Sequence, residues 1–176
     1  MNADKLALLT GLYGLAMVLG AVVMQFGFGV APCEMCFWQR YPHIAAAALG
    51  LGGFLLALAI PSLRRFLPSF AMLALLFVAV SGIIGAYHSG VEWRFLPGPS
   101  TCTGDRIVFT GTIDLNARSV VRCDIVSWRF LGLFSLANLN ALFSLGWAVL
   151  GTVLLWHPRL MTDLCGRFTG SRNKAG

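Results

Sequence analysis

The sequence predicts an all-α, polytopic membrane protein built as a bundle of four transmembrane helices. Of the 176 residues, 57% are hydrophobic and only 11% are charged, whereas a soluble domain normally carries about twice that charged fraction. The hydrophobic residues also gather in four runs without Asp, Glu, Lys or Arg. Each run exceeds the roughly 20 residues with which a helix crosses the hydrocarbon core. Backbone N–H groups in lipid must be paired within their own segment, so these runs are expected to be helices.

The limits of the charge-free runs set the expected spans. The runs extend from Leu6 to Cys33, from Tyr41 to Leu63, from Phe66 to Val91 and from Phe130 to Pro158. We expect spans at approximately residues 6–27, 41–60, 69–88 and 131–156, within one membrane domain that comprises residues 1–176. The first run is too long for the apolar part of a signal peptide, and we therefore keep it as a span.

Four spans place both termini on one side of the membrane, together with the turn 61–68 and the tail 157–176. The loops 28–40 and 89–130 then share the opposite side. Basic residues are almost evenly divided between the two sides, but Arg64 and Arg65 are concentrated in the very short turn. The positive-inside rule therefore predicts cytoplasmic termini. The net charge of +6 is spread over both faces and indicates no nucleic-acid site.

The cysteines support the same orientation independently. Four of them, Cys33, Cys36, Cys102 and Cys123, fall in the two non-cytoplasmic loops, and Cys165 falls in the cytoplasmic tail. Paired cysteines on an exported face and a lone thiol on the reducing face are what the two redox compartments favour. Cys165 is expected to be an incidental thiol.

Cys33 and Cys36 have the spacing of a redox-active pair. Two cysteines separated by two residues can close a small disulfide that is easily reduced. If a helix begins near Cys33, its N-terminal amides face the sulfurs and favour thiolate. Arg40 lies four residues after Cys36 on the same helix face, where its guanidinium could stabilise a Cys36 thiolate and hydrogen-bond a carbonyl of a bound ring.

Cys102 and Cys123 admit two interpretations on local features alone. They could form a structural disulfide that ties the loop, worth roughly 3 kcal/mol, or a mobile disulfide that exchanges with other thiols. Pro and Gly residues around Cys102 are expected to leave its sulfur exposed. A zinc site formed with Cys33 and Cys36 is a third possibility, although a second close cysteine pair is missing.

His88 ends the third expected span at the same membrane depth as Cys36 and Arg40. Ionisable groups within a membrane are candidates for function, so His88 could line a pocket for a ring head group and donate a hydrogen bond to it. His43 lies within the second expected span, and the sequence assigns it no role.

These motifs together resemble the DsbB family of membrane oxidoreductases. Residues 32–40, Pro-Cys-Glu-Met-Cys-Phe-Trp-Gln-Arg, resemble its P-C-x-x-C-x-x-x-R signature. Further stretches match the family in the same order, at residues 87–93, 98–102, 123–124 and 128–132. The four-span layout is similar as well, so the resemblance covers nearly the whole chain. It favours the catalytic interpretation of Cys102 and Cys123.

The resemblance implies a relay of disulfides. A periplasmic DsbA-like thiol oxidase would attack Cys102, the freed Cys123 would attack Cys33, and the resulting Cys36 thiolate would pass two electrons to ubiquinone or menaquinone. Arg40 would bind this quinone and His88 would be a second contact, without a metal or flavin. The implied location is the bacterial inner membrane, with the four cysteines in the periplasm. The alternative is a membrane protein with purely structural loop disulfides or a zinc site.

Overall fold

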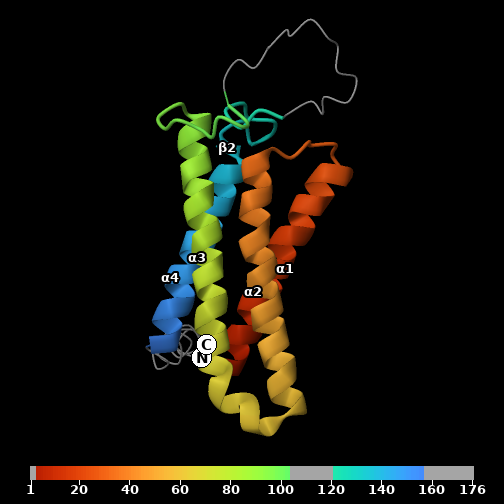
Figure 1. Ribbon diagram of the computed structural model, residues 1–176, viewed down its shortest axis with the longest axis vertical. Coiled ribbons are helices and arrows are strands. Elements are labelled where there is room, and N and C mark those ends of the chain that lie inside the picture. Colours follow the sequence, from red (N-terminus) through yellow and green to blue (C-terminus); the bar gives the residue numbers. More distant parts are fainter. Residues whose placement is uncertain (1–2, 104–120, 157–176) are drawn as a thin grey trace, which may run out of the picture.

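The computed structural model describes residues 3–103 and 121–156, and its four long helices stand side by side (Figure 1). They are α1 (Ala3–Phe26), α2 (Glu34–Ala59), α3 (Leu67–Glu92) and α4 (Leu136–Trp156). A 3-10 helix, η1 (Pro61–Phe66), joins α2 to α3. The prediction of an all-α bundle with four membrane-spanning helices is confirmed, since all four are long and apolar enough to cross a membrane. Cys165 and the tail 157–176 lie outside the described residues.

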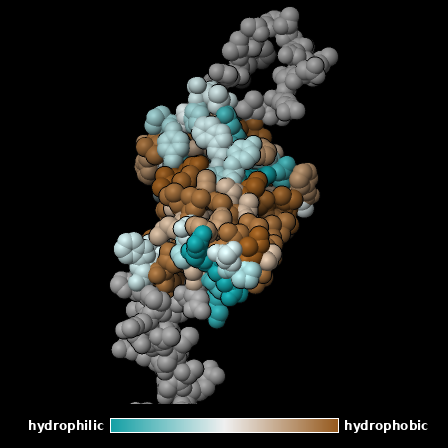
Figure 2. Space-filling view, turned by 60° about the horizontal axis from the view of Figure 1, so that its bottom comes forward, coloured by the Kyte–Doolittle hydropathy of each residue, from teal (hydrophilic) through white to brown (hydrophobic). Residues whose placement is uncertain are grey.

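The surface of the bundle is apolar around its middle. Large hydrophobic side chains such as Leu19, Leu55, Ile83 and Val149 are more than half exposed, although helices of soluble proteins bury such residues against a core. On the face drawn in Figure 2, hydrophobic residues cover the middle of the bundle and hydrophilic residues gather toward its ends. A lipid-facing surface explains this distribution.

The limits of α2, α3 and α4 differ from those expected. We expected a loop at 28–40, but α2 already begins at Glu34 and includes Arg40. The expected loop 89–130 begins later, because α3 continues to Glu92. The charge-free runs mark where hydrocarbon begins, whereas a helix continues through the polar boundary, and an acid such as Glu34 in its first turn is favourable beside the helix dipole.

The fourth span begins at Leu136 and not at residue 131. Residues 129–135 form a small hairpin in which β1 (Arg129–Phe130) pairs antiparallel with β2 (Phe134–Ser135). Leu131 and Gly132 turn the chain with φ of 51° and 73°, a backbone conformation that no helix residue adopts. At the other end of the bundle, the expected turn 61–68 is largely the helix η1, which leads directly into α3.

Glycines bring α1 and α2 into backbone contact. A Cβ atom added at Gly50 would lie 2.6 Å from Ala7 O and 2.6 Å from Gly11 N. Between helices in lipid, close packing of this kind supplies much of the attraction because the apolar side chains gain little by leaving the lipid. The contact holds α1 against α2, which is the helix that carries Cys36 and Arg40.

We predict that Gly50→Ala destabilises the bundle by about 1–3 kcal/mol, because backbone atoms of α1 cannot yield to the added methyl group. Gly52→Ala is the matched control, since a Cβ at Gly52 meets nothing within 4 Å. The measurement is unfolding in mixed micelles, followed by circular dichroism. Equal stability of the two variants would show that the α1–α2 contact does not hold the bundle together.

Candidate functional site

Cys33 and Cys36 meet at the start of α2. Cys33 is the N-cap of this helix, and its Sγ accepts a hydrogen bond from the backbone N of Cys36 at 3.3 Å. The two Sγ atoms lie 2.8 Å apart, and both cysteines are free thiols. The spacing of three residues brings the sulfurs together because one turn of helix separates them. The helix therefore begins at this pair and not at residue 41.

A hydrogen bond joins these two thiols. The hydrogen bond to Cys36 raises the pKa of Cys33 well above its usual range, and burial of the side chain raises it further. Cys33 therefore retains its proton although helix amides face it, and the Cys36 sulfur accepts the hydrogen bond. Any thiolate of this pair is expected on Cys36.

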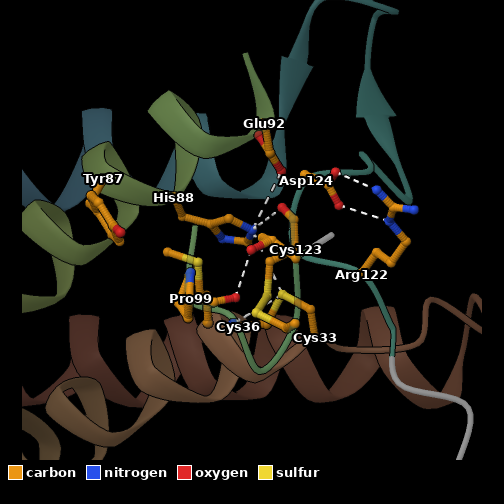
Figure 3. The surroundings of a disulfide bond; sticks show 12 residues. Cys33, Cys36, Tyr87, His88, Glu92, Pro99, Arg122, Cys123 and Asp124 are labelled. Atoms are coloured by element: carbon orange, nitrogen blue, oxygen red, sulfur yellow. Dashed lines mark hydrogen bonds and ion pairs between the residues drawn. A yellow bond between two sulfur atoms is a disulfide. The ribbon is translucent and has the colours of Figure 1, made fainter. Parts of the chain in front are cut away.

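The Cys102–Cys123 disulfide packs against the thiol pair (Figure 3). A buried cluster at this end of the bundle comprises Cys33, Met35, Val91, Cys102 and Cys123. Short backbone hydrogen bonds fold the chain back here, from Cys102 N to Pro99 O at 3.1 Å and from Cys123 N to Cys102 O at 2.8 Å. The start of α2 and the disulfide-linked loop are far apart in the sequence, and their four cysteines thus lie close together.

The expectation that Cys102 is exposed is wrong, because only 3% of its surface is accessible. The Pro- and Gly-containing segment forms an ordered turn and not an extended exposed loop. The hydroxyl of Tyr87 donates to Pro97 O at 2.6 Å, and Thr103 Oγ1 donates to Pro99 O at 2.7 Å. These contacts hold the disulfide against the helices, so an incoming thiol reaches it only after the segment is displaced.

His88 lies between the disulfide and the thiol pair. The residue is 4% exposed, and its Nε2 faces Cys123 O at 3.2 Å and Cys33 Sγ at 3.7 Å. Its Nδ1 faces Nε2 of Gln39 at 2.9 Å. The sequence placed His88 at the depth of Cys36, and the structure brings it into contact with Cys33 and Cys123 as well.

Backbone carbonyls fix the tautomer of His88. Met35 O faces Gln39 Nε2 at 3.1 Å, and Ser81 O faces Asn140 Nδ2 at 3.1 Å. A carbonyl only accepts, so each of these amide nitrogens is a donor in a defined orientation. Gln39 therefore donates to Nδ1 of His88, and the single proton of the neutral ring lies on Nε2. That N–H points toward Cys123 O and the Cys33 sulfur.

Sequence reasoning missed Gln39, Asn140 and Glu92. Asn140 Nδ2 donates to Gln39 Oε1 at 2.8 Å, and Glu92 Oε1 lies 3.9 Å from His88 Nε2. Ser135 donates a short hydrogen bond to Glu92. The available signal was the spacing of rare polar residues in apolar helices, because Glu92 follows His88 by four residues and therefore lies on the same helix face.

Arg40 faces α1 one turn below Cys36. It donates to Gln25 Oε1 at 2.7 Å and to Ala21 O at 3.3 Å, and its guanidinium lies 5.0 Å from the centre of the Phe37 ring. It is also close enough to interact electrostatically with the Cys36 sulfur. The sequence-based placement of Arg40 beside Cys36 therefore agrees with the geometry.

A cavity of about 470 Å³ opens beside these residues, within the usual range for sites that bind small molecules. Residues of α1, α2 and α4 form most of its wall, which is chiefly apolar. The polar or reactive residues on this wall are Cys33, Cys36, Gln39, Arg40, His43, His88, Glu92, Arg122, Ser127 and Asn140. A chiefly apolar chamber with polar groups on part of its wall suits a lipid-soluble ring with carbonyl or hydroxyl groups.

The zinc site considered from the sequence does not fit this arrangement. Cys102 and Cys123 are bonded to each other and offer no thiolate to a metal. In the described part of the chain, ligand atoms of Cys33, Cys36 and His88 do lie within 4.8 Å of one another. However, His88 Nε2 carries the proton, and moving it to Nδ1 would set two donors against each other at Gln39. The donor set therefore disfavours a metal.

An ion pair between Arg122 and Asp124 flanks Cys123. Arg122 donates to both carboxylate oxygens of Asp124, at 3.0 Å and 2.7 Å. The hydrogen bonds from Arg122 lower the pKa of Asp124 below its usual range. The pair spans Cys123 and braces the backbone whose carbonyl faces His88 (Figure 3).

Comparisons with known proteins point to one family. The family model described as "Disulfide bond formation protein DsbB" matches residues 3–154. Disulfide bond formation protein B of Acidovorax sp. strain JS42 is 29% identical over 146 residues, which cover 80% of each chain. The protein of the same name from Paracidovorax citrulli is 29% identical over 153 residues, or 82% of this chain and 83% of that protein. No solved structure matches the chain closely enough to compare the folds.

Proposed function

We propose that this chain, which belongs to the DsbB family of disulfide bond formation proteins, oxidises a DsbA-like dithiol and passes the two electrons to a membrane quinone. The observation that carries the proposal is the packing of the Cys102–Cys123 disulfide on the Cys33–Cys36 thiols at the mouth of an apolar cavity. Sulfurs that exchange bonds must come into contact; Cys33, Cys102 and Cys123 share one buried cluster, and Cys36 packs against it.

The first exchange takes place at Cys102. A thiolate of the partner attacks the Cys102 sulfur, which forms a mixed disulfide and releases Cys123 as a thiolate. Because Cys102 is 3% exposed, docking of the partner must first displace the turn at residues 97–103. The second thiol of the partner then attacks the mixed disulfide, so that the partner leaves oxidised and Cys102 becomes a thiolate.

The second exchange moves the electrons to the α2 pair. With Cys33 and Cys36 joined as a disulfide, the Cys123 thiolate attacks Cys33 and releases Cys36 as a thiolate. Cys102 then attacks Cys123, which restores the Cys102–Cys123 bond and releases Cys33. The sulfurs described above have the bonding of this final state. The Nε2–H of His88 faces both Cys33 and the Cys123 backbone and would orient the attack.

Quinone binding is proposed for the cavity, with ubiquinone and menaquinone as the two candidates. When bound there, a quinone would accept two electrons and two protons from the Cys33–Cys36 dithiol. Arg40, on the cavity wall and near the Cys36 sulfur, would stabilise the thiolate and hydrogen-bond a ring oxygen. His88, on the same wall, is the second proposed contact. The apolar residues around them would exclude water from the exchange.

We place the protein in the bacterial inner membrane, with cytoplasmic termini and the four cysteines in the periplasm. The start of α1, the end of α4 and η1 lie at one end of the bundle (Figure 1). The start of α2 and the end of α3 lie at the other end (Figure 1), where Cys33 and Val91 contribute to the cysteine cluster. Arg64 and Arg65 in the last turn of η1 favour the cytoplasmic side for the end at which η1 lies. The exported face provides the oxidising compartment in which disulfides persist.

A partner that lacks its resolving cysteine tests the first exchange. We predict that such a DsbA-like protein, supplied with its remaining thiol reduced, accumulates as a mixed disulfide with Cys102. Non-reducing electrophoresis and mass spectrometry of the linked peptides identify the bond. Cys165→Ser is the control and should form the same adduct, whereas Cys102→Ser should form none. An adduct at Cys33 with Cys102 unmodified would contradict the proposed order.

Substitution of Arg40 tests the quinone site. We predict that Arg40→Ala raises the KM for quinone at least tenfold, since a hydrogen bond from a charged donor contributes about 1.5–3 kcal/mol. The measurement is quinone reduction by the purified protein with a reduced partner. Arg64→Ala removes a guanidinium at the other end of the bundle and should leave the KM unchanged. An unchanged KM in Arg40→Ala would place the quinone elsewhere.

A further inference from the structure

His43 lies on the cavity wall, two turns below Cys36 on α2, and is 3% exposed. Its Nε2 lies 2.9 Å from Asn140 Oδ1. Because Ser81 O holds the Nδ2 of Asn140 at 3.1 Å, the amide oxygen must face His43, and oxygen only accepts. His43 Nε2 is therefore the donor, and the proton of the neutral ring lies there.

The other ring nitrogen, Nδ1, is consequently a bare acceptor. Among the described residues it has no hydrogen-bond partner, although it is fully buried. A buried acceptor without a partner costs about 1–3 kcal/mol, and such groups are rare in native proteins. Polar groups elsewhere in this network are satisfied, including both amides of Gln39 and Asn140.

His43 lies on the face of α2 that lines the proposed quinone cavity. Residues 36, 40 and 43 follow one another at spacings of four and three along α2, hence on one face, and the helix rises about 10 Å from the first to the last. Cys36, Arg40 and His43 all line the same cavity. Ala16, Met17, Gly20 and Phe143 also line it and offer no polar side chain.

We propose that His43 Nδ1 accepts a hydrogen bond from a ring hydroxyl of the reduced quinone, so that the cavity binds quinol more tightly than quinone. The inference rests on the proposed function and deepens it. A hydroxyl donates to a bare nitrogen, whereas a quinone carbonyl only accepts and leaves Nδ1 unpaired. His43 thus distinguishes the two redox states of the ligand.

This preference would favour the direction of electron flow. In the reaction, two thiols of Cys33 and Cys36 become a disulfide, and their two electrons and two protons convert quinone to quinol. A group that binds only the product form shifts the bound equilibrium toward disulfide and quinol by its differential affinity. His43 is a binding residue in this account and takes no part in sulfur exchange.

Two substitutions distinguish the role of His43 Nδ1 as an acceptor from the structural role of its Nε2 as a donor to Asn140. The amide nitrogen of His43→Gln can replace Nε2 as donor to Asn140, but this variant loses the acceptor at Nδ1. The amide oxygen of His43→Asn can replace Nδ1 as acceptor, but its shorter side chain does not reach Asn140. Both are made with Cys33→Ser and Cys36→Ser, so that bound quinol cannot reduce the site.

The measurement is anaerobic calorimetric titration of the full chain in micelles with decyl-ubiquinone and decyl-ubiquinol, repeated with short-chain menaquinone analogues. With His43 present, quinol should bind more tightly than quinone. In His43→Gln the ratio of the two affinities should fall about fivefold, the effect of one buried hydrogen bond. In His43→Asn the ratio should be largely retained even if the protein is less stable.

An affinity ratio that is the same in His43→Gln and in the parent would overturn the inference while leaving quinone binding intact, as would a water molecule that occupies Nδ1 in both ligand states. A loss of the ratio in His43→Asn alone would assign His43 a structural role. If neither ring form binds the parent protein, the proposed quinone site itself fails, and this inference fails with it.

Discussion

The amide of Gln39 lies where α2, α3 and α4 meet, and the arrangement of the site depends on its orientation. Its nitrogen donates to Met35 O and to His88, and its oxygen accepts from Asn140. In a bundle surrounded by lipid, apolar side chains supply little force between helices, so hydrogen bonds of this kind and close backbone packing hold the elements together. The network therefore sets both the helix positions and the protonation pattern of the two histidines.

This protonation pattern gives the two ends of the cavity opposite chemical character. At the outer end, His88 presents an N–H toward Cys33 and Cys123, where the proposed exchange would place negative charge on sulfur. Deeper in the bundle, His43 presents a bare nitrogen. Both assignments follow from two backbone carbonyls, Met35 O and Ser81 O, whose hydrogen-bonding roles are fixed by chemistry. A small number of backbone contacts thus determines which groups donate and which accept along the cavity.

Much of this arrangement could be predicted from the sequence. Charge-free runs indicate which segments cross the lipid, and cysteine spacing indicates which cysteines form a redox pair. The four spans follow from charge-free runs, the proximity of Arg40 to Cys36 follows from helical periodicity, and the depth of His88 follows from where its span ends; all three are local features. The burial of Cys102 could not be predicted, since it depends on contacts with α2 and α3 that are distant in sequence. The roles of Gln39, Asn140 and His43 depend on amide orientation, which becomes defined only when three helices pack together.

The central claim is that the α2 thiol pair passes its electrons directly to a quinone in the adjacent cavity. The most direct measurement mixes the reduced protein with quinone under anaerobic conditions in a single turnover, without any partner, and follows quinone absorbance together with the thiol content. The account predicts that one quinone is reduced per chain as Cys33 and Cys36 become a disulfide, and that Cys36→Ser reduces none. If quinone stayed oxidised while both thiols of the folded protein remained free, the account would be contradicted.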